Sequence, residues 1–181
     1  DYQIIIPSEP ATSEMLAARE VRRYVYLRTD ILLPIVQADA PGRKGNSIVL
    51  SLKDKEWLGK YEGLGSSGYE DLESQEFILK SLKQDKNITH MIIGGDPAGL
   101  LYGVYQFAEK MGIRFYLHGD VIPDEKQELE FTMMDETGSP LFRMRGILPF
   151  HDFRGGPDWW NREEYKAIIG QLPRLKMKFI G

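Results

Sequence analysis

The residues best suited to chemistry lie in one short stretch near the end of the chain. It holds Arg143, Arg145, His151, Asp152, Arg154, Asp158, Trp159 and Trp160. Carbohydrate sites need such a mixture, because aromatic faces cover the C–H side of a sugar ring and charged side chains bind its hydroxyls. The residues that we expect to contact a sugar are Arg145, His151, Asp152, Trp159 and Trp160.

The same side chains also have structural explanations. Arg145 could bind sugar hydroxyls as a charged fork, or it could pair with a barrel carboxylate. Trp159 and Trp160 could cover the end of a barrel, which is the simpler explanation of each Trp taken alone. Both alternatives stay open at the level of sequence.

Carboxylates are present in this stretch, but none is marked as a catalytic pair. Glycosidases usually place two carboxyl groups on either side of the cleaved bond. Glu163 and Glu164 open a predicted helix, where acidic side chains interact favourably with the helix dipole. Asp152 and Asp158 show no pairing, so we assign no catalytic residue.

Histidine and cysteine usage argues against a metal centre. The three histidines, His90, His118 and His151, lie in separate segments, and the chain has no cysteine. Metal ligands normally recur at short spacings, which are missing here. We expect no metal and no cofactor.

The Gly94–Gly99 segment, GGDPAG, lies between a predicted strand and a predicted helix, where phosphates often bind. Asp96 stands where a dinucleotide fingerprint needs its second glycine. We expect Asp96 to cap the helix and Pro97 to lie in its first turn. Nucleotide binding, which would depend on Gly95, is the weaker alternative.

Composition excludes several classes of function. The chain has 181 residues with 23 Lys and Arg against 27 Asp and Glu, for a net charge of -4. A nucleic-acid surface needs clustered positive charge, and a membrane span needs about 18 apolar residues in a row; the sequence has neither. The first residue is Asp1 rather than Met. Either a signal peptide has been removed or the chain is an excised piece; in the first case we expect a periplasmic or extracellular location.

Apolar periodicity predicts an α/β (α+β) layer over residues 1–138, with a mixed sheet and two packed helices. The helices are predicted at 14–28 and 98–111, and Gly112 suits a left-handed C-terminal cap. Pro34 makes 32–36 an edge strand, and the glycine-rich Lys55 to Tyr69 segment is predicted to be a surface loop. A polar turn is expected at 41–46. Further strands are predicted at 3–6, 47–52, 73–82, 87–93, 113–117 and 129–134.

Residues 139–181 differ, and predict one βαβ unit. A strand is expected at 143–148, a long loop at 149–161, a helix at 162–174 and a strand at 176–180. Barrels of about 250 residues contain eight such repeats, so this unit resembles the start of a (β/α)8 barrel. A lone parallel pair leaves its faces uncovered. We therefore expect the unit to pack on its own first domain or on a second copy, as a homodimer, through apolar side chains that an incomplete barrel would leave exposed: Phe150, Phe153, Trp159, Leu172, Met177 and Phe179.

Three stretches resemble the N-terminal α/β domain, and the barrel start after it, of family 67 alpha-glucuronidases and family 20 beta-N-acetylhexosaminidases. They are AAREVRRYVYLRTDILLPIV (17–36), IIGGDPAGLLYGVYQFAEKMGIRFYLHGD (92–120) and FRMRGILPFHDF (142–153). In family 20 the Arg of the Arg-Gly pair binds sugar hydroxyls, which implies that role for Arg145. That family has an Asp five residues later, where this chain has Phe150.

The resemblance implies a non-catalytic accessory domain and the first barrel repeat of a bacterial, secreted, polysaccharide-degrading glycoside hydrolase. The catalytic acids of both families lie on later barrel strands, so we expect no hydrolysis by this chain itself. The alternative is a stand-alone module that binds a carbohydrate or a protein. In that case Trp159, Trp160 and the 55–69 segment would form the contact surface.

Overall fold

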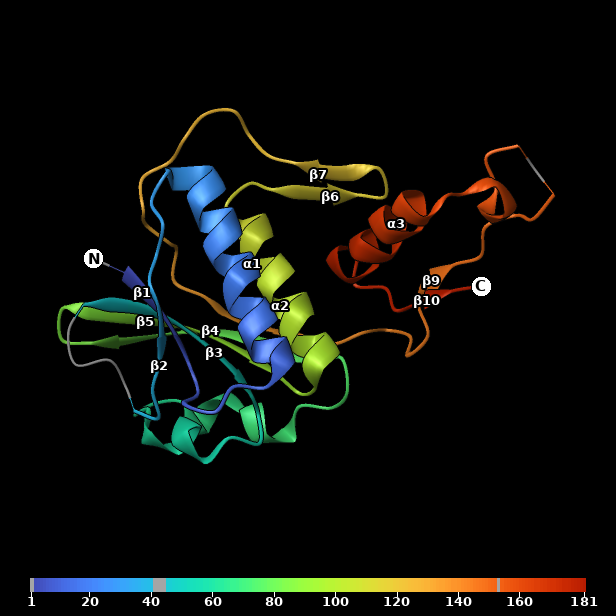
Figure 1. Cartoon of the computed structure of the whole chain (residues 1–181). Coiled ribbons are helices and arrows are strands. Elements are labelled where there is room, and N and C mark those ends of the chain that lie inside the picture. Colours follow the sequence, from blue (N-terminus) through green and yellow to red (C-terminus); the bar gives the residue numbers. More distant parts are fainter. Residues whose placement is uncertain (1, 41–44, 153) are drawn as a thin grey trace.

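The computed structural model describes residues 2–40, 45–152 and 154–181. Its centre is a six-stranded mixed sheet in the order β2-β1-β3-β5-β4-β8 (Figure 1). β2, β1, β3 and β5 run parallel, whereas β4 is antiparallel to both of its neighbours. The strands are β1 (Tyr2–Ile6), β2 (Ile35–Gln37), β3 (Asn46–Leu52), β4 (Phe77–Gln84), β5 (Asn87–Gly94) and β8 (Asp135–Gly138). The predicted mixed sheet, with an edge strand after Pro34, is confirmed.

Two helices cover one face of this sheet, as predicted. α1 (Thr12–Thr29) and α2 (Pro97–Lys110) lie side by side (Figure 1). Their apolar stripes are buried with the side chains of the sheet, including Val21 from α1 and Val104 from α2. Asp96 caps α2 by accepting a 2.7 Å hydrogen bond from the Gly99 backbone N–H. The turn into α2 is therefore a capped helix start, as expected.

The opposite face of the sheet is covered by the 55–69 segment, and the prediction of a surface loop was wrong. It folds into short 3-10 turns, η1 (Glu56–Lys60), η2 (Gly65–Ser67) and η3 (Tyr69–Asp71). Trp57, Leu58, Tyr61 and Leu64 are buried against this face. Because 3-10 turns do not repeat every 3.6 residues, their apolar positions show no helical period in the sequence.

Two other strand predictions need correction. β6 (Arg114–Tyr116) forms, but it pairs with β7 (Gly119–Val121) in a separate hairpin. No strand forms at 129–134, where the chain is irregular and Phe131 packs against the core. The strand at this edge of the sheet, next to β4, is β8. Of the predicted turn at 41–46, residues 41–44 lie outside the described part of the chain.

The tail forms the predicted βαβ arrangement. β9 (Gly146–Ile147) and β10 (Phe179–Ile180) pair in parallel, and α3 (Arg162–Arg174) connects them. Both strands are shorter than predicted. A glycine is needed at position 146 for a steric reason, because a Cβ there would lie 2.1 Å from the carbonyl oxygen of Phe179. Only glycine allows β10 to approach β9 this closely.

We predict that Gly112→Ala lowers the free energy of unfolding by about 1 kcal/mol, because Gly112 follows α2 at φ +86°, a left-handed conformation that penalises a side chain. Gly59→Ala is the matched control, since a Cβ at Gly59 would meet nothing within 4 Å and its φ is not in that region. Urea denaturation of both variants measures the difference. Equal stability of the two would contradict the assignment.

Candidate functional site

The predicted sugar-binding residues other than Arg145 lie in the loop between β9 and α3, which Asp158 organises. His151 Nδ1 lies 2.9 Å from Asp158 Oδ1, and the Asp152 backbone N–H donates to Asp158 Oδ2 over 2.8 Å. The hydrogen bond with Asp158 raises the pKa of His151, and the same contact lowers the pKa of Asp158. Asp158 belonged to the polar cluster but not to the expected contacts, and its role in holding the loop was missed.

The two adjacent tryptophans have different environments. The Trp160 indole donates a 2.8 Å hydrogen bond to the Gly155 carbonyl oxygen and packs edge-on against Tyr165, with ring centroids 5.2 Å apart. The Trp159 side chain is 70% exposed. Trp160 therefore stabilises the loop against α3, whereas the Trp159 ring is open to solvent.

Arg145 lies at the junction of the tail with α2, and its hydrogen bonds and ring contact with described residues are all outside the loop. Its Nε donates to the Lys176 carbonyl oxygen over 2.8 Å and its Nη1 to the Phe142 carbonyl oxygen over 2.5 Å. The guanidinium also lies over the Tyr102 ring, 5.5 Å from the centroid. Among the described residues, no carboxylate pairs with Arg145. Two of the three guanidinium nitrogens are therefore fixed by carbonyl oxygens, and pairing of Arg145 with a barrel carboxylate stays a prediction.

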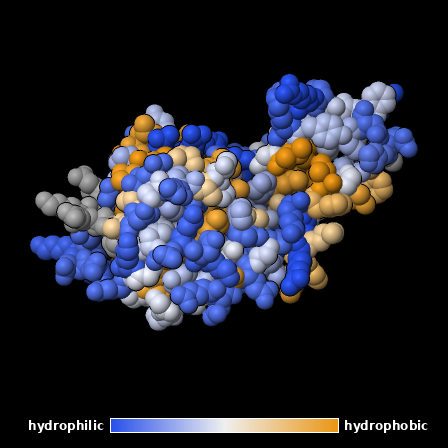
Figure 2. All heavy atoms as spheres, turned by 60° about the horizontal axis from the view of Figure 1, so that its bottom comes forward, coloured by the Kyte–Doolittle hydropathy of each residue, from blue (hydrophilic) through white to orange (hydrophobic). Residues whose placement is uncertain are grey.

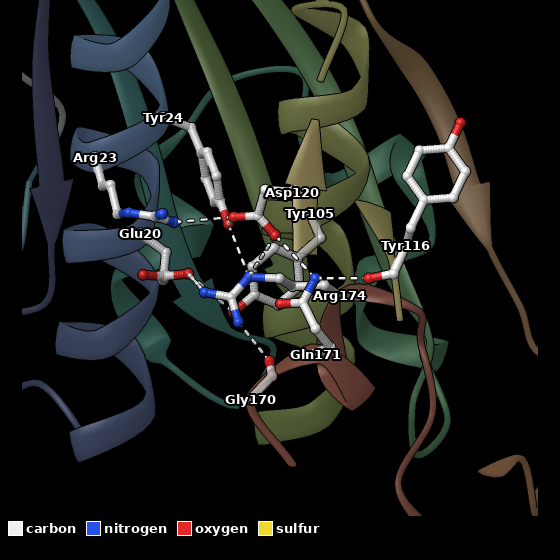
Figure 3. A network of polar contacts seen from close by, with 9 residues as sticks. All are labelled: Glu20, Arg23, Tyr24, Tyr105, Tyr116, Asp120, Gly170, Gln171 and Arg174. Carbon is white, nitrogen blue, oxygen red and sulfur yellow. Dashed lines mark hydrogen bonds and ion pairs between the residues drawn. The ribbon is translucent and has the colours of Figure 1, made fainter. Parts of the chain in front are cut away.

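A network of polar contacts fastens the tail to the first layer (Figure 3). From α3, Arg174 reaches Glu20 on α1 with an Nη2–Oε2 distance of 3.0 Å, and its Nε lies 2.9 Å from the Tyr24 hydroxyl. Gln171 donates to Asp120 on β7 over 3.1 Å. The Arg174 guanidinium also lies 5.3 Å from the centroid of the Tyr105 ring. α3 therefore has fixed polar contacts to both helices and to the hairpin.

Burial and charge shape the proton affinities in this network. Burial is the main reason that the pKa of Tyr24 rises to about 12. Burial also acts to raise the pKa of Asp120, but hydrogen bonds from Gln171 and Tyr24 and the charge of Arg174 outweigh it and hold that pKa low. At neutral pH Tyr24 is therefore uncharged, and the negative charge of Asp120 lies beside the positive charge of Arg174.

Part of the outer surface of the tail is apolar. Figure 2 shows hydrophobic surface gathered on the side of the molecule that carries the tail, next to hydrophilic surface. The exposed large apolar side chains in this region are Leu141, Phe142, Met144, Leu148, Phe150, Trp159, Tyr165, Ile169 and Phe179.

Packing of the tail on its own first domain is confirmed for α3, which packs on α2 and β6 and buries Leu172. Of the other side chains expected to need partners, Met177 is half-buried, and Phe153 lies outside the described residues. Packing on a second copy stays a prediction.

Within residues 2–40, 45–152 and 154–181, no group of three or more His, Asp or Glu side chains could hold a metal ion. In the same residues, no helix is long and apolar enough to cross a membrane.

Comparison with known proteins gives a likeness of fold. No protein-family model matches the sequence, and no curated protein matches it either. A solved family GH115 4-O-methyl-alpha-glucuronidase, with specificity for decorated arabinogalactans, superposes with a TM-score of 0.62 at 17% identity over 99% of this chain. The match covers 24% of that enzyme, so this chain spans about a quarter of its length.

The GH20 beta-N-acetylhexosaminidase from Streptomyces coelicolor A3(2) matches with a TM-score of 0.49 at 18% identity. The match covers 99% of this chain and 29% of that enzyme. The likeness to the GH115 enzyme, with its TM-score of 0.62, is the one that shows a shared mixed α/β fold.

Proposed function

We propose that this chain is the N-terminal part of a carbohydrate-degrading glycoside hydrolase. Residues 1–138 would be a non-catalytic accessory layer, and residues 139–181 the first repeat of a (β/α)8 barrel with its second strand. The observation that carries the proposal is the parallel β9–β10 pair, joined through α3, whose Arg174 forms an ion pair with Glu20 of the first layer. Two strands of two residues each cannot form a covered parallel sheet by themselves, so further strands would complete it.

The apolar surface of the tail supports the same proposal. Phe142 and Leu148 flank β9, and their side chains are 66% and 75% exposed. Large exposed apolar side chains that gather in one region normally lie against another protein element. In a complete barrel, the following strands and helices would cover it.

The loop after β9 is the proposed carbohydrate contact. In barrel enzymes the loops that follow the strands form the catalytic face. Here that loop contains the exposed Trp159 and the exposed His151 and Asp152, which are both hydrogen-bonded to Asp158. An aromatic face next to charged groups can bind both the apolar and the hydroxyl side of a sugar.

Arg145 and Trp160 would act in a more indirect way. With Arg145 Nε and Nη1 fixed by carbonyl oxygens, the remaining guanidinium nitrogen is the one that could reach a sugar hydroxyl. Trp160 would set the position of the loop through its bond to Gly155. A periplasmic or extracellular location fits an enzyme that degrades polysaccharides, and it stays a proposal.

The stand-alone binding module is the second candidate, and the exposed Trp159 favours it equally. The 55–69 segment does not support it, because the aromatic side chains of that segment are buried against the sheet. Any such module would depend on the β9–α3 loop alone.

We predict that the chain binds uronic acids or amino sugars with a change in tryptophan fluorescence, and that it does not hydrolyse aryl glycosides or glucuronides. Trp159→Ala should abolish the fluorescence change, because the other two tryptophans are packed. Phe142→Ala is the control, as an equally exposed aromatic side chain outside the loop. Turnover above background would contradict the non-catalytic role, and an unchanged titration of Trp159→Ala would contradict the loop as the contact.

A further inference from the structure

A pocket of about 600 Å³ lies at the carboxyl ends of β3 and β5, outside the β9–α3 loop. Lys53 follows β3, and Gly95 and Asp96 follow β5. The tail contributes Arg143 and Lys178 to the same pocket. Ligands of open α/β sheets bind at the carboxyl ends of parallel strands. The position of this pocket is therefore that of a ligand site.

Three cationic side chains line the pocket, and two of them retain free donors. The Lys53 ammonium is fixed, because it donates to the carbonyl oxygens of Glu70 and Leu72. The Arg143 side chain is 91% exposed, and its nearest carboxylate contact, with Glu73, is 3.8 Å long. The Lys178 backbone N–H donates to the Arg145 carbonyl oxygen, but its exposed side chain makes no hydrogen bond or ion pair with any of the described residues, although its charge helps to lower the pKa of Asp96. An anionic group could bind between Arg143 and Lys178 at little cost.

The acidic side chains of the pocket limit the charge of that group. Asp96 accepts hydrogen bonds from Ser74 Oγ, the Gln75 backbone N–H and the Gly99 backbone N–H, which hold its pKa low in spite of burial. Asp71 and Glu73 also line the pocket. A dianion such as phosphate would be repelled by these carboxylates. It could not use the N-terminus of α2 either, because Asp96 already accepts a hydrogen bond from the backbone N–H of Gly99 there. A monoanion with hydroxyl groups fits better, since its hydroxyls can donate to the carboxylates.

Gln75 gives independent evidence for a hydrogen-bond donor in the ligand. Gln75 lines the pocket and is only 3% exposed. Its backbone φ is +69°, an uncommon conformation for a residue other than glycine. Its Nε2 donates to the Arg143 carbonyl oxygen over 3.0 Å, while its Oε1 is buried without a hydrogen-bond partner among the described residues. An unpaired buried oxygen costs about 1–3 kcal/mol, which a donated hydroxyl would recover.

We propose that this pocket binds a small hydroxylated carboxylate, of the sugar-acid class. Its carboxylate lies between Arg143 and Lys178, one hydroxyl donates to Gln75 Oε1, and others donate to Asp71 and Glu73. The site combines residues of the first layer with residues of the tail, so an occupied pocket holds the two together. It needs neither hydrolysis nor sugar binding at the β9–α3 loop.

The test is calorimetric titration of the full chain with four probes. D-gluconate carries both the carboxylate and the hydroxyls, D-glucose only the hydroxyls, acetate only the carboxylate, and inorganic phosphate a higher charge. We expect gluconate to bind at least about tenfold more tightly than each of the others, because two charge-assisted contacts and the hydroxyl bonds act together. Equal binding of acetate or phosphate, or no binding of gluconate, would overturn the proposal.

Variants locate the bound probe. The double variant Arg143→Ala with Lys178→Ala should weaken gluconate binding by roughly tenfold or more. Both side chains are exposed, and the Gln75 bond goes to the Arg143 backbone, so the fold is retained. Arg162→Ala with Lys166→Ala removes the same charge from exposed positions on α3 and should leave binding unchanged. Equal weakening by both doubles would show a general charge effect and would refute the site.

Two further readouts separate this pocket from the β9–α3 loop. Trp159→Ala should leave gluconate binding unchanged, and loss of binding in that variant would place the probe at the loop instead. In an NMR spectrum, gluconate should shift the side-chain amide signal of Gln75, whereas glucose should not. A Gln75 signal that does not respond to saturating gluconate would refute the contact.

Discussion

Arg174→Ala should lower the free energy of unfolding by about 3 kcal/mol, the range found when one partner of a largely buried ion pair is removed. The Arg174 side chain is 17% exposed, and its Nε and Nη2 lie 3.4 Å from Asp120 Oδ1 and 3.0 Å from Glu20 Oε2. Without the guanidinium, two mostly buried carboxylates lose their common cation. The Tyr24 hydroxyl also loses a partner.

Lys166→Ala is the matched control for this prediction. Lys166 pairs with Glu163 on the exposed side of the same helix at 2.8 Å, and exposed pairs of this kind contribute less than about 1 kcal/mol. Urea denaturation compares the two variants, and limited proteolysis of the 149–161 loop reports whether α3 has separated from the first layer. If both variants were equally stable and equally resistant, Arg174 would not hold the tail in place.

Local patterns were sufficient for the helices, because their apolar stripes are directly visible in the sequence. α3 begins and ends where predicted, at Arg162 and Arg174. The start of α2 was also predictable, since Asp96 and Pro97 are a capping residue and a first-turn proline in sequence. The mixed sheet followed from the order of apolar runs. These features depend on neighbouring residues, so one sequence suffices to find them.

Features that depend on distant residues were not predictable. Trp57 and Tyr61 are buried only because β3 and β5 present an apolar face to them, and nothing local to residues 55–69 shows this. The edge strand β8 lies at 135–138 and not at the predicted 129–134. Its position depends on pairing with β4, which is far away in sequence, so it could not be predicted locally.

The candidate site shows the same division. The composition of the β9–α3 loop identified it as the polar and aromatic cluster. Composition did not show that Asp158 would bind both His151 and the Asp152 backbone. Arg145 was predicted to lie within the first tail strand, whereas β9 begins one residue after it, and its partners are carbonyl oxygens, which carry no sequence signal. Gln171 and Arg174 were missed because an ordinary polar helix face becomes a contact surface only once α1 and β7 lie against it.

Lowering the pH from 7 to 5 should cost the protein about 2 kcal/mol of stability through one buried histidine. His90 in β5 is fully buried, with Nδ1 2.8 Å from Ser81 Oγ and Nε2 3.3 Å from the Tyr2 hydroxyl. Burial lowers its pKa from 6.5 to about 4. Between these values the unfolded chain binds a proton that the folded chain excludes. The stability is therefore complete above pH 6.5 and falls as the pH drops towards 4.

His90→Gln should remove this dependence, because an amide keeps polar atoms in the site without titrating. The informative window lies between pH 7 and 5, above the ordinary pKa values of Asp and Glu, 3.8 and 4.5, where the carboxylates of Asp96 and Asp120 stay charged in both states. His118→Gln, in the turn between β6 and β7, controls for the loss of a histidine elsewhere. Urea denaturation at several pH values gives the slope for each protein. A slope that survives in His90→Gln and disappears in His118→Gln would assign the titration to the hairpin instead of the sheet.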